Sequence, residues 1–287
     1  MQHLFRHHAR TEKGVIACMN DTTIVVERAG AIATLTLNRP DVLNAMSRAM
    51  NAEFAHAIRE LDSDENIRVV VVTGAGAKAF SAGADIHEQV ATADRSPDEL
   101  ARMQVAPQAS GWELAACTKP TIGAINGLAF GGAALMASSL DIRIGCEHTK
   151  FRFMATVYAV NSTWTLPLVV GLPKAKELFF TSRVIEAEEA LEIGLLNKLV
   201  ASEKLMEEAL AMARSIASND PVKVQGVKKL LHQQVGMGYI ERWNNEREAS
   251  KTWLRPKPPR EAHRDFLKGH GNDQPPQGGS TEEMRRA

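Results

Sequence analysis

The chain has 287 residues, 44% of them hydrophobic and 24% charged, which is the composition of a globular protein with a sizeable buried core. Lys and Arg together number 34 and are balanced by 34 Asp and Glu, so no bulk charge favours nucleic acid or a membrane surface. The three cysteines lie far apart without a CxxC pair, which disfavours a disulfide framework or zinc site and indicates a reducing compartment, taken here as the cytoplasm.

The N-terminal stretch MQHLFRHHARTEKGVIAC lacks the apolar core of a secretory signal. No apolar run in the chain approaches the length of a bilayer span. We expect residues 1–22 to form a flexible extension, with a short transit-like segment as the alternative. Ordered structure is predicted to begin near Thr23.

The first part of the chain predicts strands that alternate with helices. Residues 24–38 read as two strands around a turn at Ala29–Gly30, and IRVVVVTG reads as a buried strand that ends at Gly74. Between them, Ser47 can cap a helix whose apolar face consists of Met50, Phe54, Ile58 and Leu61. Beyond residue 97 the pattern is helical to about Ala116, with a kink or division at Pro107.

The middle and C-terminal parts continue this alternation and then become helical. We predict a strand over TIGAI, a turn at Asn126–Gly127, a short helix from Gly131 and a strand over 142–145. From Pro173 onward the pattern is helical almost throughout, including helices over 202–218 and from Pro221 toward Trp253. Residues 271–287, rich in Gly, Pro and charge, are expected to be disordered. The fold class is therefore α/β with a helical C-terminal part.

Two stretches place small residues where a strand gives way to a helix, namely KAFSAGADIHEQ at 78–89 and INGLAFGGAAL at 125–135. One explanation is close packing of helix on sheet, and the other is a ligand that must approach the backbone. Neither is a nucleotide loop, because GAGAKAF lacks the Gly-Lys-Ser/Thr of a P-loop and Ala79 replaces the third glycine of a dinucleotide fingerprint. Free amides at two such helix starts would stabilise an oxyanion or enolate.

Four blocks of the chain together resemble the crotonase, or enoyl-CoA hydratase/isomerase, superfamily: LNRPDVLNAM, VVVTGAGAKAFSAGADI, AINGLAFGGAALMASSLDIRI and EALEIGLLNKLV. The resemblance implies a spiral of ββα units over 23–200, which binds acyl-CoA, and a helical trimerisation region over 201–270. It also implies assembly as a homotrimer or homohexamer. Coenzyme A would enter as part of a thioester substrate, so we expect no tightly bound cofactor and no metal.

By position, the resemblance assigns the family's oxyanion hole to the backbone N–H groups of Ala84 and Gly132. The coenzyme A-binding residues it implies are Lys78, Ala82, Asp85, Ile86, Phe266 and Lys268. Lys78 would lie near the phosphates, and Phe266 with Lys268 resembles a C-terminal pair that contacts the adenine end, often in a neighbouring subunit. Lys268 is one position out of register, and a solvated surface lysine is the alternative for both lysines.

The chain departs from the family's hydratases at the two positions where they carry catalytic glutamates, which are Leu135 and Ala155 here, and the window 151–165 holds no Asp or Glu. Since a general acid or base contributes about 10²–10⁴-fold, ordinary hydration should be weak or absent. Decarboxylation of a β-carboxyacyl-CoA or hydrolysis of a C–C bond needs the oxyanion hole but no glutamate pair. SAGADIHE is similar to methylmalonyl-CoA decarboxylases, although their histidine stands at Ala84. The alternative is a catalytically silent acyl-CoA-binding protein.

Other polar side chains could replace the missing glutamates. His87 and Glu88 follow Ala84 within about one helical turn, and four more candidates occupy the segment of the second glutamate: Tyr158, Asn161, Ser162 and Trp164. Tyr158 is chemically the best proton donor among them. The alternative for His87 and Glu88 is a solvated helix face, and for the aromatic residues ordinary core packing.

Overall fold

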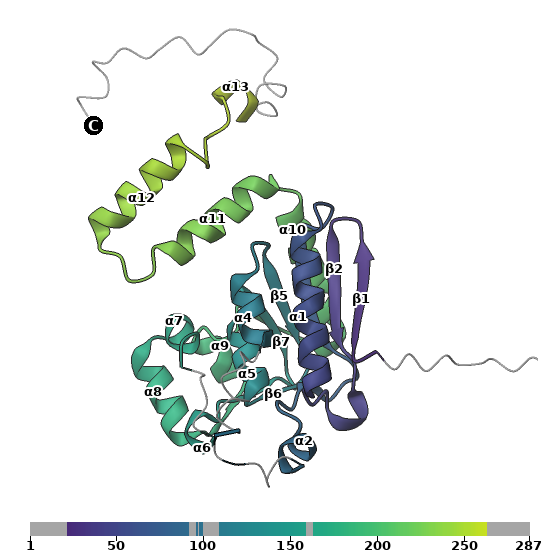
Figure 1. Cartoon of the computed structure of the whole chain (residues 1–287). Coiled ribbons are helices and arrows are strands. Elements are labelled where there is room, and N and C mark those ends of the chain that lie inside the picture. Colours follow the sequence, from purple (N-terminus) through teal and green to yellow (C-terminus); the bar gives the residue numbers. More distant parts are fainter. Residues whose placement is uncertain (1–21, 92–95, 97, 100–108, 159–162, 263–287) are drawn as a thin grey trace, which may run out of the picture. The chain divides into compact units, whose positions relative to one another are not determined.

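The computed structural model describes residues 22–91, 96, 98–99, 109–158 and 163–262 (Figure 1). The chain divides into two compact units, the first ending at Asn219 and the second beginning at Asp220. None of the helices in the described ranges is both long and apolar enough to cross a membrane.

The larger sheet of the first unit contains, in spatial order, β1 (Ile24–Ala29), β2 (Ile32–Leu37), β3 (Val69–Gly74), β5 (Thr121–Ile125), β7 (Ile142–Cys146) and β10 (Lys198–Val200). Strands β1 and β2 form the predicted antiparallel hairpin, and every other neighbouring pair is parallel. Side chains alternate along β2, so that Ala33, Leu35 and Leu37 all point into the main core.

A smaller sheet contains β4 (Ala79–Ser81), β6 (Leu128–Phe130), β8 (Lys150–Arg152) and β9 (Val184–Glu186) in that order. Its first three strands are parallel, and β9 is antiparallel to β8. Strands β4 and β6 each follow a strand of the larger sheet closely along the chain. Each repeat therefore has one strand in the larger sheet, the next strand in the smaller sheet and then a helix, which is a ββα unit.

Helices of the first unit lie on both faces of the larger sheet and around the smaller one (Figure 1). They are α1 (Arg48–Ser63), α2 (Ile86–Val90), α4 (Ala109–Ala116), α5 (Gly132–Ser138), α6 (Ala155–Tyr158), α7 (Leu166–Val170), α8 (Leu172–Thr181), α9 (Ala187–Glu192) and α10 (Leu205–Ala217), with 3-10 turns η1 (Pro40–Val42) and η2 (Ser202–Lys204). The predicted cap of α1 is confirmed, because the Ser47 side chain accepts a hydrogen bond from Met50 N at 3.1 Å. Its predicted apolar face is buried.

The expectation of an almost wholly helical region after Pro173 is wrong in two respects. Strands β9 and β10 lie within it, each only three residues long and flanked by strong helix formers that hide the strand pattern. The helix expected from Pro221 toward Trp253 is two helices, α11 (Pro221–Gln233) and α12 (Tyr239–Lys251). The first helix has its C-cap at Gln234, and the chain turns just beyond it at Gly236, which has a φ of 82°.

The second unit contains α11, α12 and a short helix α13 (Pro259–Ala262). Leu254 packs against Gly226 of α11, and Lys229 lies 4.5 Å from the ring centre of Trp253. The first unit includes α10, which packs on the larger sheet through Leu205, Ala209 and Ala213.

Candidate functional site

The two turns that the sequence singled out meet in space because the strands before them are neighbours. Strands β4 and β6 pair in parallel, with Ala79 opposite Leu128 and Ser81 opposite Ala129, so both end at the same edge of the smaller sheet. The contact is very close at Gly83, where an added Cβ would lie 2.4 Å from Phe130 O and 3.4 Å from Gly132 N. With a φ of 89°, Gly83 also adopts a conformation that favours glycine.

The amide of Ala84 is left free by the way its neighbours are held. Met46 N donates to Gly83 O at 2.7 Å, and Asp85 N donates to Met46 O at 3.2 Å. In such a parallel bridge the residue between, Ala84, directs its own N–H and C=O away from the partner strand. Ala84 is exposed, and no group in the described part of the chain accepts a hydrogen bond from its N–H.

Gly132 offers a second free amide at the same edge of the smaller sheet as the Ala84 amide. It is the first residue of α5, where an N–H has no partner within the helix. Gly131 precedes it with a φ of 54° and a ψ of −118°, a conformation that reverses the chain between β6 and α5. The sequence therefore brings two backbone donors to one edge of the smaller sheet, and small residues line both turns.

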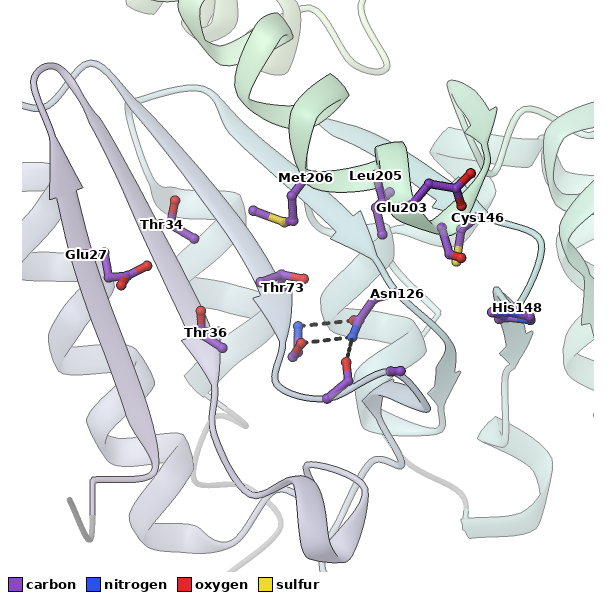
Figure 2. A pocket seen from close by; sticks show the side chains of 14 residues that line it. Glu27, Thr34, Thr36, Thr73, Asn126, Cys146, His148, Glu203, Leu205 and Met206 are labelled. Atoms are coloured by element: carbon purple, nitrogen blue, oxygen red, sulfur yellow. Dashed lines mark hydrogen bonds between the residues drawn. The ribbon is translucent and has the colours of Figure 1, made fainter. Parts of the chain in front are cut away.

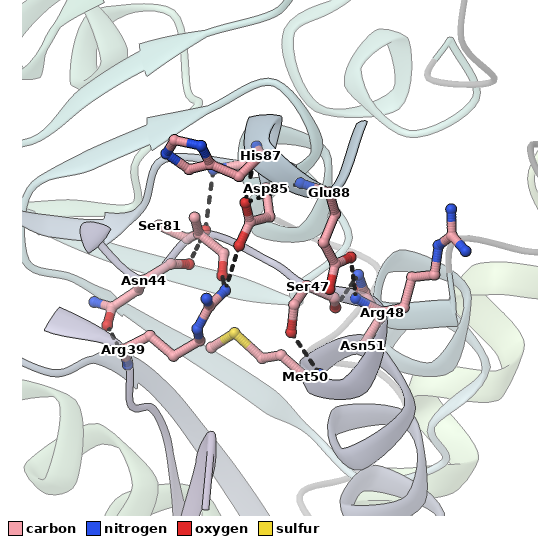
Figure 3. A network of polar contacts seen from close by, with 12 residues as sticks. Arg39, Asn44, Ser47, Arg48, Met50, Asn51, Ser81, Asp85, His87 and Glu88 are labelled. Carbon is pink, nitrogen blue, oxygen red and sulfur yellow. Dashed lines mark hydrogen bonds and ion pairs between the residues drawn. The ribbon is translucent and has the colours of Figure 1, made fainter. Parts of the chain in front are cut away.

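A polar network holds the turn before Ala84 in place (Figure 3). The Asn44 side chain is fully buried, accepts from Arg39 N at 2.9 Å and donates to Ala75 O and Ala79 O, both at 2.9 Å. The backbone carbonyl of Asn44 accepts from Ser81 Oγ at 2.7 Å, and that hydroxyl accepts from Gly83 N at 3.1 Å. Buried networks of this kind are rigid when every member is satisfied.

The Arg39 guanidinium extends the network to the residue after Ala84. One of its nitrogens donates to Ala45 O at 2.6 Å and to Asp85 Oδ2 at 2.8 Å. The other carboxylate oxygen of Asp85 accepts from the amides of His87 and Glu88 at the start of α2. The Arg39 hydrogen bond, reinforced by these amides, lowers the pKa of the buried Asp85 carboxyl against the opposing effect of desolvation.

This lowered pKa predicts an acid-dependent contribution to stability. Because the folded-state pKa of Asp85 lies below the unfolded value of about 3.9, the stabilisation is complete above that pH and is lost as the pH falls through the folded pKa. Urea unfolding between pH 7 and pH 2.5 should show Asp85→Asn less stable than wild type at neutral pH, with the difference shrinking below about pH 4. Glu186→Gln, which removes an exposed partner of Lys150, is the control. An equal, pH-dependent loss of unfolding free energy in this variant would contradict the assignment of the effect to the Asp85 carboxyl.

The two positions that the resemblance assigns to the hydratase glutamates are apolar in the structure. Leu135 lies one turn into α5 and Ala155 begins α6, and both are half-buried against the main core. The Leu135 carbonyl accepts from the hydroxyls of Ser138 and Ser139, each at 2.9 Å. Neither α5 nor α6 contains a carboxylate.

The structure places the other predicted residues as follows. His87 is exposed, whereas Glu88 accepts from Arg48 N at 2.9 Å and so holds the start of α1. Lys78 is exposed in the loop before β4 and Ile86 is exposed at the start of α2.

Trp164 is partly exposed, with its ring 6.4 Å from that of Trp112. The backbone of Tyr158 ends α6, and its side chain lies outside the described residues, as do Asn161, Ser162, Phe266 and Lys268.

Sequence reasoning missed Arg39, Asn44 and Ser81 as parts of the site. The first two lie in LNRPDVLNAM, which supported the resemblance but suggested no role for single residues. No local signal singles them out, because their partners Ala75, Ala79 and Asp85 lie more than 30 residues further along the chain. Among the described residues, no group of three or more His, Cys, Asp or Glu is arranged to hold a metal ion.

Comparison with solved structures defines the class of protein. A crystal structure of an enoyl-CoA hydratase from Bacillus anthracis superposes with a TM-score of 0.79 at 30% sequence identity, covering 86% of this chain and 97% of that one. A crystal structure of an enoyl-CoA hydratase subunit I from Geobacillus kaustophilus superposes with a TM-score of 0.77 at 31% identity, covering 90% of this chain and 99% of that one. The protein has the crotonase fold, as its sequence predicts.

Sequence comparison then gives the family. A short-chain-enoyl-CoA hydratase from Clostridium acetobutylicum is 35% identical over 219 residues, 75% of this chain and 83% of its own length. A crotonyl-CoA hydratase from Syntrophomonas wolfei is 33% identical over 206 residues, 70% and 78% of the two lengths. The family model for enoyl-CoA hydratase/isomerase matches residues 27–267. The chain belongs to the enoyl-CoA hydratase/isomerase family, whose enzymes act on acyl-CoA.

Proposed function

We propose that this protein is an acyl-CoA lyase that binds the thioester carbonyl oxygen between the amides of Ala84 and Gly132 and stabilises the enolate formed from it. The observation that carries the proposal is the meeting of the two turns at Gly83, where an added Cβ would lie 3.4 Å from Gly132 N, with both donors free among the described residues. Preorganised backbone donors contribute large rate factors when negative charge develops on the oxygen they bind.

The chemistry that this site favours is decarboxylation of a β-carboxyacyl-CoA. The bond between the α-carbon and the carboxylate breaks, CO₂ leaves, and the bonding electron pair passes into the enolate held by the two amides. A proton then reaches the α-carbon, with Tyr158 or His87 as the candidate donors. No carboxylate base is needed, which agrees with the apolar side chains of Leu135 and Ala155. C–C hydrolysis of a β-ketoacyl-CoA uses the same enolate, and a silent acyl-CoA-binding protein is the alternative.

Coenzyme A would lie along the segment that contains Lys78, Ala82, Asp85 and Ile86. Lys78 is exposed and available for a phosphate, whereas the Asp85 side chain is bonded to Arg39 and would contribute only through its backbone. Phe266 and Lys268 are proposed for the adenine end. Assembly as a homotrimer or homohexamer and a cytoplasmic location remain predictions.

The test is a mass-spectrometric turnover assay with crotonyl-CoA, methylmalonyl-CoA and a β-ketoacyl-CoA. Gly132→Pro removes one donor at a first helical position that tolerates proline, and Gly132→Ala is the matched control that keeps the N–H. We expect CO₂ loss or C–C cleavage in wild type, falling by about 10²-fold in Gly132→Pro and much less in Gly132→Ala.

Two outcomes would change this assignment. Hydration of crotonyl-CoA at an ordinary hydratase rate would show that an unrecognised acid and base pair replaces the glutamates, which contradicts the lyase proposal. Retained binding of all three thioesters, measured by calorimetry, without any turnover would favour the silent binding protein.

A further inference from the structure

One face of the larger sheet is apolar at one end of its strands and polar at the other. On the side covered by α10, Ile32, Val69 and Val71 pack against that helix. Toward the carboxyl ends of the same strands the chain carries threonines, with Thr36 directly opposite Thr73 and Thr34 opposite Val71. Glu27 stands opposite Thr34 on β1, which adds a carboxylate to this threonine-rich half of the face.

This polar half forms the floor of a cavity of about 590 Å³ (Figure 2). Its walls are Asn126 after β5, Cys146 at the end of β7, His148 just beyond it, Ser202 and Glu203 of η2, and Met206 at the start of α10. Such a volume is ordinary for a small-molecule site. None of the residues predicted for acyl-CoA lines it, so it is separate from the candidate active site.

The lining is rich in hydrogen-bond acceptors and negative charge. Glu27 and Glu203 have no ion-pair partner within the described ranges, and no Lys or Arg lines the cavity. The Thr73 hydroxyl, on a residue only 8% exposed, donates to Ala124 O at 2.9 Å, so its oxygen keeps its capacity to accept. Ser202 Oγ donates to Glu147 at 3.0 Å, and the backbone amide of Glu147 itself, together with this bond, lowers the pKa of that carboxyl.

The side-chain amide of Asn126 offers no free N–H donor to the cavity. Its amide nitrogen is fully used in hydrogen bonds to Gly74 O and Gly76 O, both at 2.8 Å, and its oxygen accepts from Gly74 N at 3.2 Å. The same bonds fix the loop of residues 74–77, which lines the cavity and leads into Lys78 and β4. A ligand seated here would contact the reverse side of the loop that precedes the candidate active site.

We propose that this cavity is a binding site for a compact organic cation with several N–H donors, of the alkylammonium class. Carboxylates at opposite walls and threonine oxygens on the floor match the charge and donors of such a ligand. An anionic ligand would be repelled by both carboxylates, and a neutral donor would gain hydrogen bonds to them without the attraction between opposite charges. The one basic side chain of the lining, His148, lies 3.6 Å from Glu147. The site is independent of the acyl-CoA chemistry proposed above.

The test measures binding of three four-carbon probes to the full chain by isothermal titration calorimetry at low salt: 1,4-diaminobutane, 1,4-butanediol and succinate. We expect the diamine to bind and the diol and succinate to bind at least tenfold more weakly or not at all. Glu27→Gln and Glu203→Gln should each weaken the diamine about 3- to 10-fold, as expected for a partly exposed ion pair with a further hydrogen bond. Glu192→Gln, an exposed carboxylate on α9 without a described ion pair, is the matched control and should bind like wild type.

Hydrogen exchange gives a second readout that locates the ligand. Bound diamine should slow amide exchange in peptides that cover residues 72–78, and leave those of α8 unchanged. Absence of diamine binding at millimolar concentration would overturn the proposal. Equal weakening by Glu192→Gln, or binding unaffected by both cavity variants, would show only general attraction to surface carboxylates and would overturn it as well.

Discussion

Replacement of Gly83 by alanine should abolish most activity, with a loss of roughly 10³-fold or more in kcat/KM for whichever thioester the wild type converts. The added Cβ would lie 2.4 Å from Phe130 O, a backbone atom that cannot move without shifting β6 and Gly131. Both proposed donors would then move, because Ala84 follows Gly83 directly and Gly132 N lies 3.4 Å from the same Cβ. A single donor is worth about 10²–10³-fold, so displacement of two should cost more.

The same substitution also strains the backbone, and a matched variant separates the two effects. Gly30 has a φ of 59° in the hairpin turn and nothing within 4 Å of its Cβ position. Gly30→Ala should therefore show only the conformational cost of about 1–2 kcal/mol in urea unfolding, with activity unchanged. Gly83→Ala should lose more stability and nearly all turnover. Full turnover in folded Gly83→Ala would contradict the oxyanion site between these turns.

Local patterns in the sequence predict much of this fold. The stripe of Met50, Phe54, Ile58 and Leu61 gives α1 and its buried face, and Ser47 marks its start. The alternation of β2 gives both faces of the larger sheet, since one set of residues enters the main core and the other faces α10 or the cavity. These elements are predictable because their signals lie within a few residues of one another.

The parts that could not be predicted depend on contacts between distant segments. Strands β9 and β10 have three residues each and exist because β8 and β7 offer an edge to pair with. The approach of Gly83 to Gly132 depends on the pairing of β4 with β6, which no local pattern specifies. Leu43 and Asn44 have φ values of 54° and 55°, unusual for residues other than glycine, and tertiary hydrogen bonds hold them there.

Asn44 is the residue whose loss should cost the most stability in this network. Its side chain makes three hydrogen bonds in a fully buried position, to Arg39 N, Ala75 O and Ala79 O. At about 1 kcal/mol for each bond, and more where a buried partner is left unsatisfied, Asn44→Ala should lose at least about 3 kcal/mol in the free energy of unfolding. Alanine also tolerates the positive φ less well than asparagine does.

The loss should reach the candidate active site, because the Asn44 carbonyl binds Ser81 Oγ and that hydroxyl binds Gly83 N. At temperatures where the variant stays folded, kcat should fall more than KM rises, since the substitution displaces the proposed donors and leaves the Lys78 side chain, proposed to bind coenzyme A, in place. Asn51→Ala is the control, because Asn51 makes one partly buried bond to Ser47 O at 3.0 Å and should cost about 1 kcal/mol with activity intact. Equal effects of the two substitutions on kcat would show that Asn44 supports the fold without positioning the Ala84 amide.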